Sequence, residues 1–266
     1  MGVSERRERE RQELRSRIMD AARRLFAEEG YEAVSMRRIA EAIEYSPTAI
    51  YLHFADKQAL FNEICAEDFG RLATVFGKLG TVSDPVQRIR EIGRTYVRFA
   101  LEYPNHYRLM FMTPSAPDEV PPEQMAKRGN PDEDAYAFLR TTVREGIESG
   151  RFRPELTDAD LLTQSLWASV HGVASLQITH STDVWVDWRP VEAIVDLTCT
   201  AGLRGMLRDP DSLPASTPLP KTKNAKAARA ATSTPKRHCP VAKGAKHVAK
   251  VLASALSRKP GTGDAR

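Results

Sequence analysis

Apolar residues recur at intervals of three and four along most of this chain, which is the spacing that gives an α-helix one buried face. The first such stripe runs from Leu14 to Phe26 and ends at Gly30. Later stripes with the same period fall at residues 36–43, 60–76, 89–100, 107–112, 135–147, 161–178 and 194–207. No alternating pattern typical of β-strands separates them. The pattern therefore predicts an all-α fold.

Capping residues mark where several of these helices begin. Asp56 is expected to cap a long helix that ends near Gly77, and Ser83 or Asp84, followed by a proline, opens the next helix, which runs to Pro104. Residues 113–131 are rich in proline and are predicted to form a loop, followed by a helix over 132–149. Thr157 with Asp160 is typical of a capping box and predicts the start of the helix that runs to about residue 178. The last helix is expected to follow Pro190.

Two short helices joined by a tight turn are predicted between residues 35 and 54. Ser35 is expected to cap the first helix and Ser46 the second, in which Pro47 suits the first helical position because it needs no N–H donor there. The outer side of the second helix is small, polar and aromatic, which fits the major groove of DNA. Spacing alone equally allows a plain helical hairpin within an all-α domain.

The residues themselves favour DNA binding, because the run TAIYLHFADKQAL at 48–60 closely resembles the recognition-helix signature of the tetracycline-repressor (TetR) family. The resemblance implies a dimeric transcription regulator whose larger C-terminal helical domain binds a small molecule. It carries phosphate contacts onto Ser35, Tyr51, His53 and Lys57, and base-edge contacts onto Arg37, Pro47, Thr48 and Ala49, with Ser46 as the cap between them. The family usually has Gly-Val in the turn, where this chain has Glu44-Tyr45, so a left-handed backbone there would cost about 1 kcal/mol.

Small residues form a seam along the last two predicted helices. Such a seam lets helices approach closely, either inside one subunit or between two subunits. The resemblance places the dimer interface on these helices, as a four-helix bundle across a twofold axis, and so favours the second interpretation. The residues of the seam are Ser165, Ala168, Gly172, Ser175, Ala201 and Gly205.

An aromatic residue and a histidine lie one turn apart next to this seam. They are Trp167 and His171. A histidine beside a tryptophan on an apolar helix is most often a hydrogen-bonded core residue. The run WASVHG at 167–172 nevertheless resembles the Trp-His-Gly signature of one C-terminal subgroup of the family, often preceded by a segment like 104–111. In that context Trp167, His171, Tyr107, Met110 and Phe111 are predicted to line an apolar pocket for a small-molecule effector.

Charge is distributed unevenly along the chain. Residues 212–266 hold 12 Lys and Arg against one acidic residue, which leaves 27 basic and 34 acidic residues in the first 211. The net charge of +4 is therefore a basic tail on a folded part of about −7. The tail composition predicts disorder, with one amphipathic basic stretch at 241–256 that could become a helix on DNA or an anionic membrane. The charged residues 5–17 predict either a solvated helix extension or a frayed arm that reaches the minor groove.

Several functional classes find no support in the sequence. Three cysteines, far apart, indicate neither a disulfide framework nor a zinc site, and a reducing cytoplasm fits best. No apolar run approaches the ~18 residues of a membrane span, and no signal peptide is predicted. Phosphate loops, nucleophile elbows and metal-ligand clusters are absent from the sequence, so we expect no enzyme activity, no metal and no cofactor.

Together these patterns predict a charged N-terminal arm (1–13), a helix-turn-helix domain (14–61), a helical regulatory and dimerisation domain (62–208) and a basic tail (209–266). The predicted function is a ligand-responsive regulator, a repressor, that binds a palindromic operator in double-stranded DNA as a homodimer and is released by a small apolar effector. The alternative is a sequence-tolerant, nucleoid-associated DNA-binding protein dominated by its basic tail.

Overall fold

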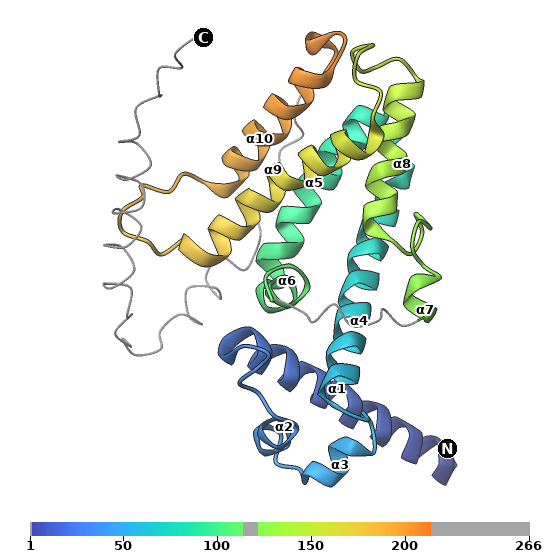
Figure 1. The fold of residues 1–266 in the computed structure, drawn as a ribbon, viewed down its shortest axis with the longest axis vertical. Helices are drawn as coiled ribbons and strands as arrows, with labels where there is room; N and C mark the ends of the chain where they lie inside the picture. Colours follow the sequence, from blue (N-terminus) through green and yellow to red (C-terminus); the bar gives the residue numbers. More distant parts are fainter. Residues whose placement is uncertain (1, 114–121, 214–266) are drawn as a thin grey trace, which may run out of the picture. The chain divides into compact units, whose positions relative to one another are not determined.

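The computed structural model describes residues 2–113 and 122–213 of the chain (Figure 1). These residues fold into α-helices, and the β-type pairing within them is limited to an isolated bridge between Phe152 and Leu207. The predicted all-α fold is confirmed. Among the described residues no helix is long and apolar enough to cross a lipid bilayer.

The N-terminal helices enclose an apolar core of their own. They are α1 (Val3–Glu29), α2 (Met36–Ala42), α3 (Pro47–Tyr51) and the first half of α4 (Lys57–Gly77). The apolar stripe of each helix points inward, as its spacing predicts. Side chains that are completely buried here include Ile18, Ala22, Leu25, Ile39, Ala40, Ile50, Leu60 and Ile64. We call this unit of α1, α2, α3 and the start of α4 the head.

The remaining helices form a second apolar core, which begins at Leu72 in the second half of α4. They are α5 (Pro85–Glu102), α6 (Pro104–Phe111), α7 (Pro122–Met125), α8 (Ala135–Glu148), α9 (Ala159–His180) and α10 (Val191–Met206). A 3-10 helix, Lys78–Thr81, joins α4 to α5. In Figure 1, α5 lies among α4, α8, α9 and α10. We call this unit the body, and α4 is shared between the head and the body.

Three predictions about helix starts in the body were wrong. Asp158, and not Thr157, caps α9, because its carboxylate accepts from the N–H groups of Asp160 and Leu161 at 3.0 Å each. In the same way Asp134 caps α8, which starts at residue 135 and not at 132. The predicted loop at 113–131 contains the short helix α7, with Pro122 as its first residue. In each case a better-placed carboxylate or proline sets the helix start.

The folded part of the chain continues slightly beyond α10. Pro210–Ser212 form a 3-10 helix capped by Asp209, and the side chain of Leu213 packs against the core of the body. Arg151 Nη2 donates to the carbonyl of Ser212 at 3.5 Å. The rest of the predicted basic tail, residues 214–266 with its amphipathic stretch, lies outside the described residues.

Candidate functional site

The helix-turn-helix forms through local capping bonds. Ser35 Oγ accepts from the backbone N–H of Arg38 at 3.1 Å and so begins α2. Ser46 Oγ accepts from the N–H of Ala49 at 3.2 Å and begins α3, with Pro47 at the first helical position. Both predicted caps are confirmed. The buried side chain of Ile50 fixes which side of α3 faces inward, so the other side is left for solvent or DNA.

The turn between α2 and α3 has a left-handed backbone, although it has no glycine. Glu44 has φ +61°, and a residue with a Cβ in this region costs about 1 kcal/mol compared with glycine. Contacts around the turn compensate for this strain. The N–H of Tyr45 donates to the carbonyl of Ala40 at 3.0 Å, and Arg17 of α1 lies over the Tyr45 ring and donates to the carbonyl of Ile43. These contacts hold the angle between α2 and α3.

Of the nine residues predicted to contact DNA, eight lie on α2, α3 or their flanks, and Lys57 is the first residue of α4. These helices lie at the lower end of the view in Figure 1. Most of their side chains are exposed, and Arg37 pairs with the exposed carboxylate of Glu41 at 3.0 Å. Tyr51 is 54% exposed although it is a large aromatic residue. The exposed members are Ser35, Arg37, Ser46, Pro47, Thr48 and Tyr51, and the half-buried members are Ala49, His53 and Lys57.

Two of the half-buried residues also have a role inside the head. Lys57 Nζ donates to the carbonyl of Tyr31 at 2.9 Å and lies 4.2 Å from the centre of the Tyr31 ring. The carbonyl of His53 accepts from Arg15 Nη1 at 3.1 Å. Burial, followed by the positive charges of Arg11 and Arg15, lowers the pKa of His53 below its ordinary value. The imidazole is therefore neutral at pH 7, and its contribution to binding a phosphate would be a hydrogen bond.

A cluster of charged residues joins the head to the body, and sequence analysis missed it. Asp68 of α4 is completely buried and accepts from Arg23 of α1 at 3.0 and 3.1 Å. His106 Nδ1 of α6 lies 2.8 Å from the same carboxylate. The signal was present in the sequence, because Asp68 falls on the apolar stripe of α4 between Ile64 and Leu72. We call Arg23, Asp68 and His106 the junction cluster, since it ties three helices together.

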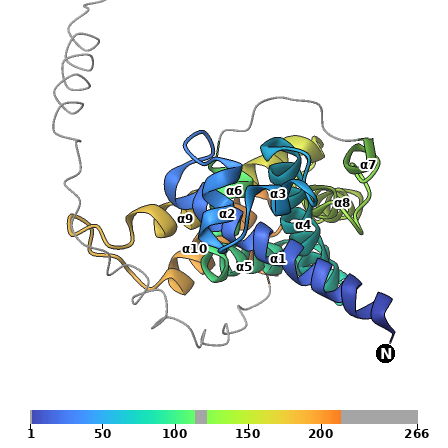
Figure 2. The same ribbon diagram turned by 90° about the horizontal axis from the view of Figure 1, so that it is seen from below.

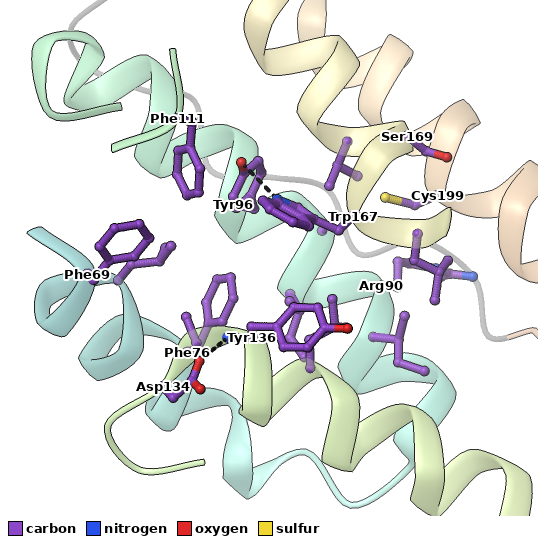
Figure 3. Close-up of a pocket in the computed structure, with 18 of the residues that line it drawn as sticks. Phe69, Phe76, Arg90, Tyr96, Phe111, Asp134, Tyr136, Trp167, Ser169 and Cys199 are labelled. Atoms are coloured by element: carbon purple, nitrogen blue, oxygen red, sulfur yellow. Dashed lines mark hydrogen bonds between the residues drawn. The ribbon is translucent and has the colours of Figure 1, made fainter. Parts of the chain in front are cut away.

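The body contains a cavity of about 410 Å³, which is within the range of small-molecule sites. Six aromatic residues line it, most of which sequence analysis did not select, because they come from five different helices and meet only in the folded chain. Figure 3 shows Phe69 and Phe111 at one end and Arg90, Ser169 and Cys199 at the other. The six aromatic residues are Phe69, Phe76, Tyr96, Phe111, Tyr136 and Trp167.

Two of the five residues predicted to line a pocket, Phe111 and Trp167, line this cavity. Tyr107, Met110 and His171 are not among the described residues that line it. Tyr107 and His171 lie behind the wall in a hydrogen-bond chain with Tyr96. Trp167 Nε1 donates to Tyr96 Oη at 3.1 Å, the two tyrosine hydroxyls are 3.3 Å apart, and Tyr107 Oη lies 2.7 Å from His171 Nδ1.

This hydrogen-bond chain stays neutral at pH 7. Burial lowers the pKa of His171 and raises the pKa of Tyr96 to about 12. Burial also raises the pKa of Tyr107. With His171 neutral, Tyr107 donates to Nδ1 and the remaining proton of the imidazole is on Nε2. The chain thus satisfies the polar atoms that Trp167 and Tyr96 contribute to the cavity wall, through Tyr107 and His171 behind it.

Charge at the other end of the cavity is balanced within the protein. Arg90 is buried, and its pKa is lowered first by burial and then by the neighbouring Arg94. Arg94 Nε in turn donates to Asp196 at 2.7 Å, and its Nη1 lies 3.3 Å from Glu91. Two cations and two carboxylates therefore sum to zero, and the aromatic wall favours an apolar ligand. No grouping of His, Cys, Asp and Glu in residues 2–113 and 122–213 has the form of a metal site.

The small residues of the predicted seam lie on the outer side of α9 and α10. A Cβ added at Gly172 or Gly205 would meet nothing within 4 Å, so these glycines are not needed for packing inside one subunit. Large apolar side chains are exposed on the same two helices: Leu161 at 60%, Leu176 at 50% and Leu197 at 70%. Among the seam residues Ser165, Ala168, Ala201 and Gly205 are exposed, and Gly172 and Ser175 are half-buried.

Family models match both units of the chain. Residues 18–64 match bacterial regulatory proteins of the tetR family, and residues 89–201 match the tetracyclin repressor-like C-terminal domain. The second match is to a C-terminal domain of general description and does not identify the Trp-His-Gly subgroup.

The curated relatives include HTH-type transcriptional repressors and regulators. The HTH-type transcriptional repressor Rv1474c of Mycobacterium tuberculosis is 46% identical over 68 residues, which are 26% of this chain and 36% of that protein. The first three relatives are thus matched over about a third of their own length. The repressor AcnR of Corynebacterium efficiens is 30% identical over 144 residues, which are 53% of this chain and 70% of the relative.

Solved structures share the fold over most of the described chain. The TetR family regulator PfmR of Thermus thermophilus superposes with a TM-score of 0.56 and 25% identity, covering 70% of this chain and 97% of that one. A putative fatty acid metabolism regulator of Clostridium perfringens superposes with a TM-score of 0.59 and 16% identity, covering 72% and 98%.

Proposed function

Since this chain belongs to the TetR family of DNA-binding regulators, we propose that it represses transcription as a homodimer on a palindromic operator and leaves the operator when a small apolar effector binds. The observation that carries the DNA-binding part is the helix-turn-helix, whose capped helix α3 exposes Pro47, Thr48 and Tyr51. A major groove admits one such helix, so that its side chains reach base edges.

Within the head, the side chains divide into two proposed roles. Arg37, Pro47, Thr48 and Ala49 contact base edges, while the second set contacts phosphates. That set is Ser35, Tyr51, His53 and Lys57, with Ser46 holding the start of α3. Lys57 contributes a charge that is already oriented by the Tyr31 carbonyl and ring. Phosphate contacts set the position of the protein, and base contacts select the sequence.

Replacing Arg37 and Lys57 separately is expected to give different defects. Arg37→Ala should reduce discrimination by about 1 to 3 kcal/mol at one base pair, because a base contact is lost. Lys57→Ala should weaken binding to all sequences alike and reduce the salt slope by about 1. The measurement is a mobility-shift titration of an operator, found by genome-wide mapping of bound sites, and of its single-base variants.

Arg38→Ala is the matched control, because Arg38 is also an exposed arginine of α2 in an ion pair at 3.0 Å, but its partner Glu29 belongs to α1, whereas the partner of Arg37 is Glu41 of α2 itself. It should change neither discrimination nor affinity by more than about 1 kcal/mol. If Arg37→Ala behaves like this control at every base pair, the assignment of Arg37 to base reading is wrong.

The dimer part of the proposal is supported by the outer side of α9 and α10. Exposed leucines beside small residues form a surface that a second copy can cover closely. The proposed interface comprises Ser165, Ala168, Gly172, Ser175, Ala201 and Gly205 together with the exposed leucines. A twofold axis through it would place the two recognition helices about 34 Å apart, one turn of DNA.

The effector part of the proposal is supported by the cavity in the body. An effector there would touch Phe111 and Trp167, and its binding would favour one arrangement of α4 and α6 over another. Both helices belong to the junction cluster through Asp68 and His106, so a change in either reaches α1 and the head. The other three predicted pocket residues do not line the cavity, so they would affect effector binding only indirectly, by supporting the side chains that do. They are Tyr107, Met110 and His171.

A neutral apolar probe, N-phenyl-1-naphthylamine, is expected to bind this cavity and quench tryptophan fluorescence. Trp167→Phe should remove most of the quenching, because Trp167 lines the cavity. The control Trp185→Phe should retain it, because Trp185 is 91% exposed. Binding only to the native state should also stabilise the protein by about 2.7 kcal/mol at a hundredfold excess over Kd. Equal quenching in both variants would exclude this cavity as the binding site.

The second function, a nucleoid-associated protein that tolerates any sequence, draws on the 12 basic residues after residue 211. These basic residues, at positions 221–266, lie outside the described residues, and their charge favours sequence-independent binding to phosphates. Competition with random DNA separates the two functions. A regulator should keep its operator in a large excess of random duplex, whereas a coating protein should be displaced in proportion to the competitor.

A further inference from the structure

The first turns of α1 extend beyond the apolar core of the head, and the helix face that is buried in the core becomes exposed there. Ile18, Ala22 and Leu25 are completely buried on this side. Positions four and seven residues apart share a helix face, so the same side carries Arg11 and then Arg7 toward the N-terminus. Both arginines are exposed. Figures 1 and 2 show from two directions that this part of α1 extends past α3 and α4. We call Arg7 and Arg11 the arginine row.

The arginine row begins next to the end of the recognition helix. Arg15, one turn after Arg11, donates to the carbonyl of His53 at 3.1 Å and lies over the Phe54 ring. Arg11 is therefore about 6 Å further along α1 from this contact, and Arg7 about 6 Å beyond Arg11. The charge of Arg11 also reaches the His53 ring, whose pKa it lowers. The arginine row thus adds positive charge next to the surface formed by Tyr51 and His53.

Three of the acidic side chains near the row have partners of their own. Glu10 pairs with Arg6 at 3.5 Å, and Glu8 accepts from Gln12 Nε2 at 3.0 Å. Glu63 of α4 pairs with Arg15. Neither arginine of the row forms an ion pair with any residue that the structure describes. Two positive charges therefore face outward beside the proposed DNA-binding helix.

We propose that Arg7 and Arg11 bind phosphates of the duplex that flanks each operator half-site, on the side remote from the dimer axis. The inference rests on the proposed function, and it extends the DNA contact beyond the helix-turn-helix. The partner is the backbone of double-stranded DNA of any sequence, since arginines on one face, one turn apart, offer charge without a surface shaped for base edges. The first turn of α1 adds the positive end of the helix dipole.

The test compares two duplexes that contain the same operator, which is first identified by selecting bound sequences from a pool of random DNA. One duplex ends at the outer borders of the half-sites, and the other carries ~10 additional base pairs on each side, one helical turn. The full-length protein should bind the longer duplex more tightly and with a steeper salt dependence. Arg7→Ala with Arg11→Ala should remove this advantage and flatten the log-log salt slope by roughly 1.8 per subunit.

The matched control is Arg6→Ala with Arg9→Ala, which removes the same charge from the other side of the same helix. Alanine favours helix, so α1 should persist in both double variants, as circular dichroism can verify. The control should keep the preference for the longer duplex. Equal salt slopes for the two double variants, or equal binding of the two duplexes by the unaltered protein, would overturn the proposal. A different result would contradict the proposed function itself: the unaltered protein would bind neither operator duplex more tightly than random DNA.

Discussion

Asp68→Ala is expected to destabilise the protein by about 3 to 5 kcal/mol, the effect of removing one partner from a buried ion pair. The Asp68 carboxylate is completely inaccessible to solvent, and the side chain of Arg23 is only 5% exposed. Without the carboxylate, the Arg23 guanidinium stays buried with only Asp20 and Glu67 at its outer edge. Urea unfolding followed by circular dichroism measures the loss.

Glu67→Ala is the matched control, because Glu67 is the neighbouring carboxylate on α4 and also pairs with Arg23, at 3.3 Å. Its side chain is 47% exposed, so this change should alter the free energy of unfolding by about 1 kcal/mol or less. Replacing the whole pair by Arg23→Met with Asp68→Leu should recover much of the stability, since no buried charge is then left alone. Equal unfolding midpoints for Asp68→Ala and Glu67→Ala would refute this account of the junction cluster.

Features set by neighbouring residues could be predicted from the sequence. The caps at Ser35, Ser46 and Asp56 depend on bonds to N–H groups three residues ahead, so the local sequence determines them. The left-handed backbone at Glu44 was indicated by the family resemblance, which has a glycine in the turn, and not by the local sequence of this chain. The wrong start for α9 shows the limit, since Thr157 and Asp158 both fit a cap and only hydrogen-bond geometry selects Asp158.

Features that depend on several helices could be predicted only in part. Phe111 and Trp167 were selected as pocket residues, but Phe69, Phe76 and Tyr136 were not, because their apolar character equally fits a filled core. His171 was selected for its place next to Trp167, yet its imidazole bonds to Tyr107 behind the wall. Charged residues on apolar stripes, such as Asp68 and Arg94, were the clearest signals of tertiary contacts that sequence analysis left unused.

Leu197→Glu is expected to prevent dimer formation and to reduce operator affinity by about a hundredfold or more, since linked binding to two half-sites adds at least this much. Leu197 is 70% exposed in the isolated subunit, so the change should leave the fold of that subunit intact. In a dimer, the carboxylate would be buried in an apolar interface without a partner, which is strongly unfavourable. Sedimentation velocity and mobility shift on the selected operator measure the two effects.

Met125→Glu is the control for this variant, because it also places a carboxylate at an exposed apolar residue, 46% exposed, but on α7 and not on α9 or α10. It should sediment as the unaltered protein does and keep its operator affinity. A smaller change on the same surface should have a smaller effect. Gly172→Ala adds one methyl group at a place where the subunit itself leaves open space. It should weaken the dimer without changing the free energy of unfolding of the subunit. If Leu197→Glu sediments as a dimer and binds the operator normally, the interface lies elsewhere, and the separation of the two recognition helices must be set by another surface of the body.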